Sequence, residues 1–216
     1  MTMSKVIHID PEAPSAEAIN LAAHVLRDGG IVVFPTETVY GIGAAASSCI
    51  GPQEIIDIKM RSASKPLPWL VETESALDVY GVEVPDYAHN LAKRFWPGPL
   101  SLVVKASEKV GKDFRDARGT VALRCPDHEV VQELIRASGG PIITTSANTS
   151  GNPPAASFEE LEPRIIHAAD LTLDGGETHH GVASTVVDCT GPTPEVLREG
   201  AISTGDIEAA AKGLDA

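Results

Sequence analysis

The stretch 29–43 reads GGIVVFPTETVYGIG and carries the strongest fold signal in the chain. Its continuous apolar run, Ile31 to Phe34, is typical of a strand buried on both faces. Pro35 lacks a backbone donor and ends that strand. Polar side chains then precede two glycines, namely Thr36, Glu37, Thr38 and Tyr40. This pattern is typical of a small-molecule site, although an ordinary strand-to-helix turn would have the same composition.

Length and composition indicate a soluble globular chain with one substantial core. Of the 216 residues, 43% are apolar and 22% are charged, which excludes a disordered composition. No apolar run approaches the roughly 18 residues that span a bilayer, and the N-terminus has no apolar signal-peptide core. The three cysteines are far apart (Cys49, Cys125 and Cys189), which predicts reduced thiols in the cytoplasm and no C-x-x-C metal site.

The charge balance argues against a protein that coats nucleic acid. The net charge is −13, whereas phosphate binding requires a basic surface. Residues 93–118 are nevertheless rich in lysine and arginine. This segment is either a solvated face or the side on which an anionic partner approaches.

Periodicity predicts an α/β chain in which strands and helices alternate without a strict βαβ period. A single domain with a twisted, mixed sheet follows. We expect a charged loop at 106–119 and short strands at 6–9, 31–34, 67–71, 100–104, 120–124, 142–146, 171–174, 184–188 and 195–198. The expected helices are 15–28 with Ser15 as N-cap, 53–60, 86–95, 127–138 capped by Asp127, one beginning at Ser157, and 206–212.

A cluster of cations follows the second expected helix, at Lys59, Arg61 and Lys65. Lys59 and Arg61 can converge only if the helix ends between them, because residues two apart point to opposite sides of a helix. The nearby Pro66 favours such an ending. The cluster could hold a polyphosphate, or it could be a solvated basic turn.

Two further stretches carry polar groups at strand ends. Arg124 ends the expected strand 120–124, where its guanidinium could bind a carboxylate with two prongs or form an ion pair with a neighbouring acid. The stretch 142–151 reads IITTSANTSG, and its hydroxyls, amide and backbone N–H groups suit ribose or phosphate recognition. A turn rich in serine and asparagine is the alternative.

The chain lacks the signatures of several enzyme classes. It has no G-x-S-x-G nucleophile elbow, no G-x-x-x-x-G-K-[ST] phosphate loop and no G-x-G-x-x-G. The remaining candidates are cations, hydroxyls and an amide, which orient substrates and stabilise phosphoryl charge. We therefore expect a nucleotide-using enzyme with a second pocket for a small carboxylate.

Several motifs in order resemble the threonylcarbamoyl-AMP synthase family (YrdC/Sua5-like proteins). They are PTETVYGIG, K-x-R followed by KPL, FWPGPLSLV, TVALRCP, TSANTSG, ASTVVD and LREG. The similarity covers about residues 16–200 and implies one YrdC-like domain over 1–216, of the short form without a C-terminal Sua5 domain. The implied fold has a mixed sheet and helices around a concave cleft, like the dsRNA-binding YrdC/RibB α/β fold.

The resemblance implies an L-threonylcarbamoyladenylate synthase, a nucleotidyltransferase of tRNA t6A37 biosynthesis. ATP, L-threonine and bicarbonate would give threonylcarbamoyl-AMP and pyrophosphate, with Mg²⁺ accompanying ATP. Transferase-complex proteins would receive the adenylate, with at most weak tRNA contact and no membrane partner. The implied ATP-binding residues are Lys59 and Arg61, which are also catalytic, with Lys65, Ser146, Asn148 and Arg198. The implied threonine-binding residues are Thr36, Arg124 and Ser184.

Two departures from the family pattern concern threonine contacts. Leu70 stands where some relatives have histidine, and Ala183 stands where many have glutamate. The rival functions are an RNA-binding module, a carbamoyl-transferring domain of the hydrogenase-maturation type, and a divergent paralogue of unknown activity. The intact K-x-R and S-x-N residues argue against the paralogue.

Overall fold

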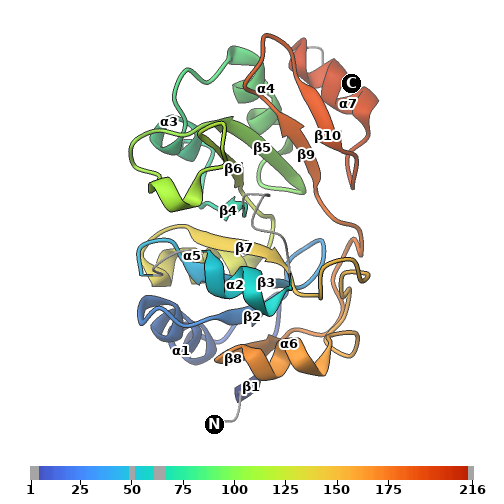
Figure 1. Ribbon diagram of the computed structural model, residues 1–216. Helices are drawn as coiled ribbons and strands as arrows, with labels where there is room; N and C mark the ends of the chain where they lie inside the picture. Colours follow the sequence, from blue (N-terminus) through green and yellow to red (C-terminus); the bar gives the residue numbers. More distant parts are fainter. Residues whose placement is uncertain (1–4, 49–51, 61–66, 214–216) are drawn as a thin grey trace.

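The computed structural model describes residues 5–48, 52–60 and 67–213, and its strands form one mixed ten-stranded sheet (Figure 1). The strand order is β1-β8-β2-β3-β7-β4-β6-β5-β9-β10. The strands are β1 (Lys5–His8), β2 (Val32–Phe34), β3 (Gly41–Ala45), β4 (Trp69–Leu70), β5 (Leu100–Lys105), β6 (Thr120–Arg124), β7 (Ile142–Ser146), β8 (Leu171–Asp174), β9 (Thr185–Asp188) and β10 (Glu195–Arg198). Parallel and antiparallel pairs are both present, which confirms the predicted α/β class with a mixed sheet.

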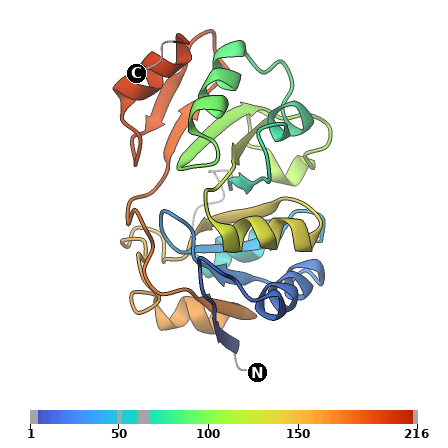
Figure 2. The ribbon, with the colours of Figure 1, turned by 180° about the vertical axis from the view of Figure 1, so that it is seen from behind.

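Helices pack against the sheet both around β2 and β8 and around β5. They are α1 (Ala16–Arg27), α2 (Gln53–Ile58), α3 (Ala76–Tyr80), α4 (Asp86–Phe95), α5 (Glu129–Ser138), α6 (Pro163–Ala168) and α7 (Thr204–Ala211), with a 3₁₀ turn at Lys112–Phe114. Figure 2 shows α1 and α5 lying side by side against the half that contains β2 and β8. Helices α4 and α7 pack together at the opposite end, near β5 and β9. Within the described ranges, no helix is both long and apolar enough to cross a membrane.

The expected strand at the centre of the opening stretch is confirmed as β2. It is buried throughout and pairs with β8 in parallel and with β3 in antiparallel register. Residues 35–40, here called the polar turn, connect β2 to β3 rather than to a helix. The strand-to-helix alternative is therefore wrong. Two of the five residues of β3 are glycines, a composition that strand propensity disfavours.

The glycines of β3 allow close packing. A Cβ on Gly43 would lie 2.6 Å from the carbonyl oxygen of Ile143 and 2.9 Å from Cγ2 of Ile142 on β7. A Cβ on Gly41 would lie 3.1 Å from the Phe34 ring. The glycines therefore bring β7 and the Phe34 ring against β3, which places the end of β7 beside the polar turn.

Gly43→Ala should destabilise the protein, because the added methyl group meets backbone that cannot move away. We expect a loss of about 1–3 kcal/mol in the free energy of unfolding, measured by urea denaturation. Gly205→Ala on α7 is the matched control, since its Cβ would lie 3.9 Å from Oγ of Ser203. That variant should be neutral or gain about 0.4–1 kcal/mol. Equal stabilities of the two variants would contradict the packing role of Gly43.

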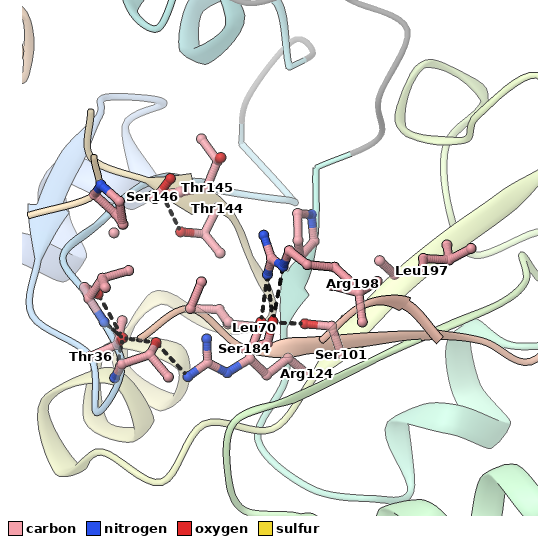
Figure 3. Close-up of a pocket in the computed structure, with 18 of the residues that line it drawn as sticks. Thr36, Leu70, Ser101, Arg124, Thr144, Thr145, Ser146, Ser184, Leu197 and Arg198 are labelled. Carbon is pink, nitrogen blue, oxygen red and sulfur yellow. Dashed lines mark hydrogen bonds between the residues drawn. The ribbon is translucent and has the colours of Figure 1, made fainter. Parts of the chain in front are cut away.

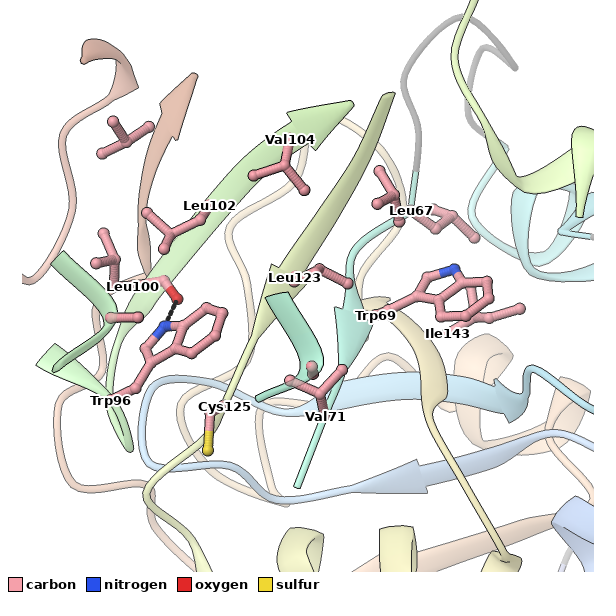
Figure 4. Packing of buried hydrophobic residues seen from close by; sticks show 14 of the residues in the cluster. Leu67, Trp69, Val71, Trp96, Leu100, Leu102, Val104, Leu123, Cys125 and Ile143 are labelled. Atoms are coloured by element: carbon pink, nitrogen blue, oxygen red, sulfur yellow. Dashed lines mark hydrogen bonds between the residues drawn. The ribbon is translucent and has the colours of Figure 1, made fainter. Parts of the chain in front are cut away.

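A buried hydrophobic cluster packs around β4, β5 and β6, strands that contribute residues to the site (Figure 4). Trp96 is 8% exposed, and its Nε1 donates to the carbonyl oxygen of Leu100 at 2.7 Å. Trp69 meets the rings of Tyr80 and Phe114 edge-on at 5.3 and 5.8 Å. These contacts hold β4, β5 and β6 at fixed positions.

Several helix boundaries differ from the sequence expectations. Helix α5 begins at Glu129 with His128 as its N-cap, one residue after the expected cap Asp127, whose N–H donates to Oε1 of Glu37. The expected helix at Ser157 is wrong, since Ser157 bridges to Glu177 and α6 begins at Pro163. Helix α3 was not expected at all. Ser15, by contrast, caps α1 as predicted.

Candidate functional site

A cavity of about 650 Å³ lies between the two halves of the molecule (Figure 3). It is lined by residues of β4, β5, β6, β7, β9 and β10 and by the polar turn after β2. Six sequence-predicted site residues line it: Thr36, Arg124, Ser146, Asn148, Ser184 and Arg198. Arg61 and Lys65 lie outside the described residues, so their roles stay predictions.

One wall of the cavity is a row of side chains across neighbouring strands. Leu70 on β4 pairs with Arg124 on β6, and Ser101 on β5 pairs with Val186 on β9. Val186 in turn pairs with Arg198 on β10. The pairing of Leu102 with Leu123 places Ser101 next to Arg124 in this row. Paired residues share a face of a sheet, so register alone brings two arginines to one cavity.

A second row, two residues along each strand, completes this wall. Val103 pairs with Ala122, and the N–H of Thr144 donates to the carbonyl oxygen of Pro68 at 2.8 Å. All four residues line the cavity. The row that contains Val103 and Ala122 thus presents small, uncharged side chains, whereas the row that contains Arg124 and Arg198 carries positive charge.

Arg124 is held by the polar turn, which resolves the two readings of this residue. Its Nη2 lies 2.7 Å from Oε1 of Glu37 and donates to Oγ1 of Thr38 at 3.0 Å. Its Nε donates to the carbonyl oxygen of Gly98 at 3.4 Å. Within the described part of the chain, Nη1 makes no hydrogen bond. Arg124 therefore forms a buried ion pair and still lines the cavity, but one nitrogen rather than two remains for a ligand.

Glu37 is 2% exposed and stays ionised beside Arg124. Burial alone would raise the pKa of its carboxyl. The charge and hydrogen bond of Arg124 and the N–H of Asp127 outweigh burial, so the pKa lies below its usual value. Among the residues that the structure describes, Oε2 has no hydrogen-bond partner. Glu37 therefore supplies a fixed negative charge behind the arginine.

The hydroxyl of Thr36 organises the turn. It donates to the carbonyl oxygen of Val39 at 2.8 Å and accepts the N–H of Thr38 at 3.1 Å. Its distance to Oγ1 of Thr38 is 2.8 Å, and Thr38 donates in that contact because the hydrogen of Thr36 is used elsewhere. Thr36 therefore fixes Thr38 against Arg124, whatever further contact it makes with a ligand.

Arg198 lies against Ser184 (Figure 3). Its Nε and Nη2 donate to the carbonyl oxygen of Ser184 at 3.1 and 2.7 Å, and Nη2 lies 3.3 Å from the Ser184 hydroxyl. The Ser184 hydroxyl also lies 3.2 Å from that of Ser101. Burial, then the charge of Arg124, lowers the pKa of Arg198. Among the described residues, no carboxylate pairs with Arg198, which leaves its charge available to an anion.

Lys59 is the C-cap of α2, which is two residues shorter than the expected helix 53–60. The helix stops at Ile58, and Met60 has a φ of +52°, so the chain changes direction immediately after Lys59. Lys59 is 3% exposed, and its Nζ donates to the carbonyl oxygen of Ser146, to Oγ of Ser146 at 3.3 Å and to Oδ1 of Asn148 at 3.0 Å. The structure thus joins the predicted lysine to the S-x-N residues at the end of β7.

The charged loop 106–119 contributes to the rim of the cavity. Asp116 and Arg118 line the cavity, and Nη1 of Arg118 lies 2.7 Å from Oδ2 of Asp188. Arg115 donates to the carbonyl oxygen of Val110 at 2.8 Å. The Arg118 contact ties the expected charged loop to β9, and the Arg115 contact lies within the loop.

Sequence reasoning missed Ser101 and Ala122 as cavity residues. The alternation of Ala122 and Arg124 along one strand was the available signal, because residues two apart share a face. The two departures from the family pattern, Leu70 and Ala183, both line the cavity. They therefore lie where a substrate would touch them.

His128, next to the Glu37 turn, makes stability depend on pH. Burial lowers its pKa to about 4 from an ordinary 6.5, against a smaller opposing effect of Glu37. The unfolded chain therefore binds a proton that the folded protein excludes, and stability falls as pH drops from 6.5 to 4. We expect the unfolding free energy to fall by about 3 kcal/mol over this range. His128→Phe should remove most of this slope in urea denaturation, and an unchanged slope would contradict the assignment.

Comparisons with known proteins agree with this geometry. Residues 24–200 match the Sua5_yciO_yrdC family model, described as telomere recombination. The threonylcarbamoyl-AMP synthase of Pyrococcus abyssi is 42% identical over 190 residues, which span 88% of this chain and 56% of that protein. A putative threonylcarbamoyl-AMP synthase of Mycobacterium tuberculosis is 40% identical over 96% of this chain and 94% of its own length.

Solved structures give the same relationship. Sua5 of P. abyssi complexed with L-threonine is 39% identical with a TM-score of 0.88, over 96% of this chain and 61% of that one. YciO of Escherichia coli is 28% identical with a TM-score of 0.86, over 93% of this chain and 98% of that one. The match over residues 24–200 and the identities above 30% lead to one conclusion: the chain belongs to the Sua5/YciO/YrdC family.

Proposed function

We propose that the protein is an L-threonylcarbamoyladenylate synthase, a nucleotidyltransferase that forms threonylcarbamoyl-AMP and pyrophosphate from ATP, L-threonine and bicarbonate. The carrying observation is the convergence of Arg124 and Arg198 on one cavity, where Arg198 has no carboxylate partner within the described part of the chain. Two cations beside hydroxyl and amide groups suit two anionic ligands, a carboxylate and a polyphosphate. Relatives named threonylcarbamoyl-AMP synthase support the same choice.

In this proposal each group has one task. Arg124 binds the threonine carboxylate through Nη1, and Thr36 and Ser184 contact the amino acid. Ser146, Asn148, Lys65 and Arg198 bind the nucleotide. The threonine amine first attacks the bicarbonate carbon, and loss of water leaves a carbamate. A carbamate oxygen then attacks the α-phosphorus in line, the bond to the bridging oxygen breaks, and pyrophosphate leaves. Lys59 and Arg61 stabilise its charge.

Mg²⁺ would accompany the nucleotide in this reaction. The described residues contain no group of three or more His, Cys, Asp or Glu side chains that could hold a metal ion. Mg²⁺ commonly binds through substrate phosphates and keeps several waters. We therefore assign the ion to the triphosphate, where it would neutralise the leaving group.

The product implies a place in tRNA modification. A threonylcarbamoyl-adenylate is an activated acyl donor, so we propose that proteins of a t6A transferase complex receive it in the cytoplasm. The net charge of −13 supports no more than weak direct contact with tRNA.

Pyrophosphate release by the purified protein tests the proposal. We expect release from ATP that requires both L-threonine and bicarbonate, with L-serine a poorer substrate. Mass spectrometry should detect threonylcarbamoyl-AMP in the same mixture. Release that ignores threonine, or none while ATP still binds, would overturn the proposal.

A paralogue with another small carboxylate substrate is the second candidate. Leu70 supports it, because an apolar side chain lies next to Arg124 where some relatives have a histidine. A panel of amino acids in the release assay separates the two candidates, since the paralogue would prefer an acid other than threonine.

A further inference from the structure

We propose that Glu37 is a positioning residue that selects which nitrogen of Arg124 the cavity presents to a substrate carboxylate. This inference rests on the proposed function, in which Arg124 binds that carboxylate. Glu37 does not line the cavity, and its side chain is 3% exposed. Its effect on a ligand must therefore pass through Arg124.

The geometry of the guanidinium carries the inference. Nη2 lies 2.7 Å from Oε1 of Glu37 in the ion pair and donates to Oγ1 of Thr38 at 3.0 Å, so among the described residues both contacts of the terminal nitrogens fall on Nη2. The single hydrogen of Nε points to the carbonyl oxygen of Gly98 at 3.4 Å. Only Nη1 then retains both hydrogens for a ligand, and it presents them in one orientation.

Glu37 is itself fixed, so it can act as an anchor. Its Oε1 accepts the N–H of Asp127 at 3.1 Å as well as the arginine hydrogen. Its carbonyl oxygen accepts the N–H of His180 at 2.9 Å. The N–H of Asp127 holds the carboxylate and the N–H of His180 holds the main chain of Glu37, so the arginine must adopt the position that Glu37 sets.

Glu37 could act on Arg124 in two ways: by fixing its position through an acceptor oxygen, or by balancing its charge. These two roles predict opposite results for two conservative variants. Glu37→Gln keeps an oxygen at the position of Oε1 and removes the charge. Glu37→Asp keeps the charge and withdraws the oxygen by one methylene group. If geometry positions Arg124, glutamine preserves the function and aspartate does not.

The test is steady-state pyrophosphate release with separate KM values for L-threonine and ATP. We expect Glu37→Gln to keep the threonine KM within about threefold of the wild-type value. Glu37→Asp and Glu37→Ala should raise it at least tenfold, with kcat and the ATP KM changed less than threefold. Glu208→Gln, on the exposed side of α7, is the matched control and should change nothing.

Two controls keep the result interpretable. Circular dichroism and thermal unfolding verify that each variant is folded, and if Glu37→Ala fails this check, the Gln and Asp variants decide alone. An unchanged threonine KM in Glu37→Asp, or a raised one in Glu37→Gln, overturns the inference. If the wild-type protein releases no pyrophosphate with threonine, the proposed function fails instead, so the two failures are distinguishable.

Discussion

Lys59→Met should reduce threonine-dependent pyrophosphate release at least a thousandfold. Nζ is buried and donates to both Ser146 and Asn148, the residues proposed to hold ATP. Methionine fills a similar volume but carries no charge, so the polyphosphate loses a cation in a site of low dielectric, where charge matters most. Catalysis by positioned charge should therefore collapse even where the fold persists.

The same variant should also lose stability, because the Lys59 ammonium is buried among hydrogen-bond acceptors. Its removal leaves buried acceptors on Ser146 and Asn148 unpaired, at a cost of about 1–3 kcal/mol. Activity is therefore measured well below the melting temperature, with exposed Lys93→Met as control. More than a tenth of wild-type activity in Lys59→Met would rule out a central role for this ammonium.

Local signals explain what could be predicted from the sequence. The apolar run of β2 and the serine cap of α1 depend on near neighbours, and both elements formed as expected. Arg124 was found because it follows an apolar strand and precedes proline. The helix at 53–60 was expected from its apolar residues, and α2 forms there but ends at Ile58.

The parts that could not be predicted depend on long-range contacts. β3 is a strand because β2 and β7 pair with it from both sides, although its glycines have low strand propensity. Glu37 and Arg124 are far apart in sequence. Only the pairing of strands from β2 to β6 across the sheet brings Nη2 of Arg124 to 2.7 Å from Oε1 of Glu37. The rows across the cavity arise from register between strands, which local patterns do not encode.

Arg124→Met should cost about 3–5 kcal/mol of unfolding free energy at pH 7, because it leaves the Glu37 carboxylate buried without its partner. Adding Glu37→Gln should recover most of this loss, since a neutral amide can still accept the N–H of Asp127. Neither variant should bind threonine, because the proposed carboxylate ligand is gone. Urea denaturation and isothermal titration with L-threonine measure the two effects separately.

The pH dependence of this loss identifies its cause. In the wild-type protein the pKa of Glu37 lies below 4.5, so the ion pair contributes its full stability above that pH and loses it as pH falls through the folded pKa. In Arg124→Met, burial without the arginine raises the pKa of Glu37 instead, and the carboxyl stays protonated in mild acid. The penalty of the single variant should therefore shrink between pH 7 and pH 4.5, whereas the double variant should show no such change. A penalty independent of pH would mean that lost packing of the arginine stem, rather than the unpaired carboxylate, destabilises the protein.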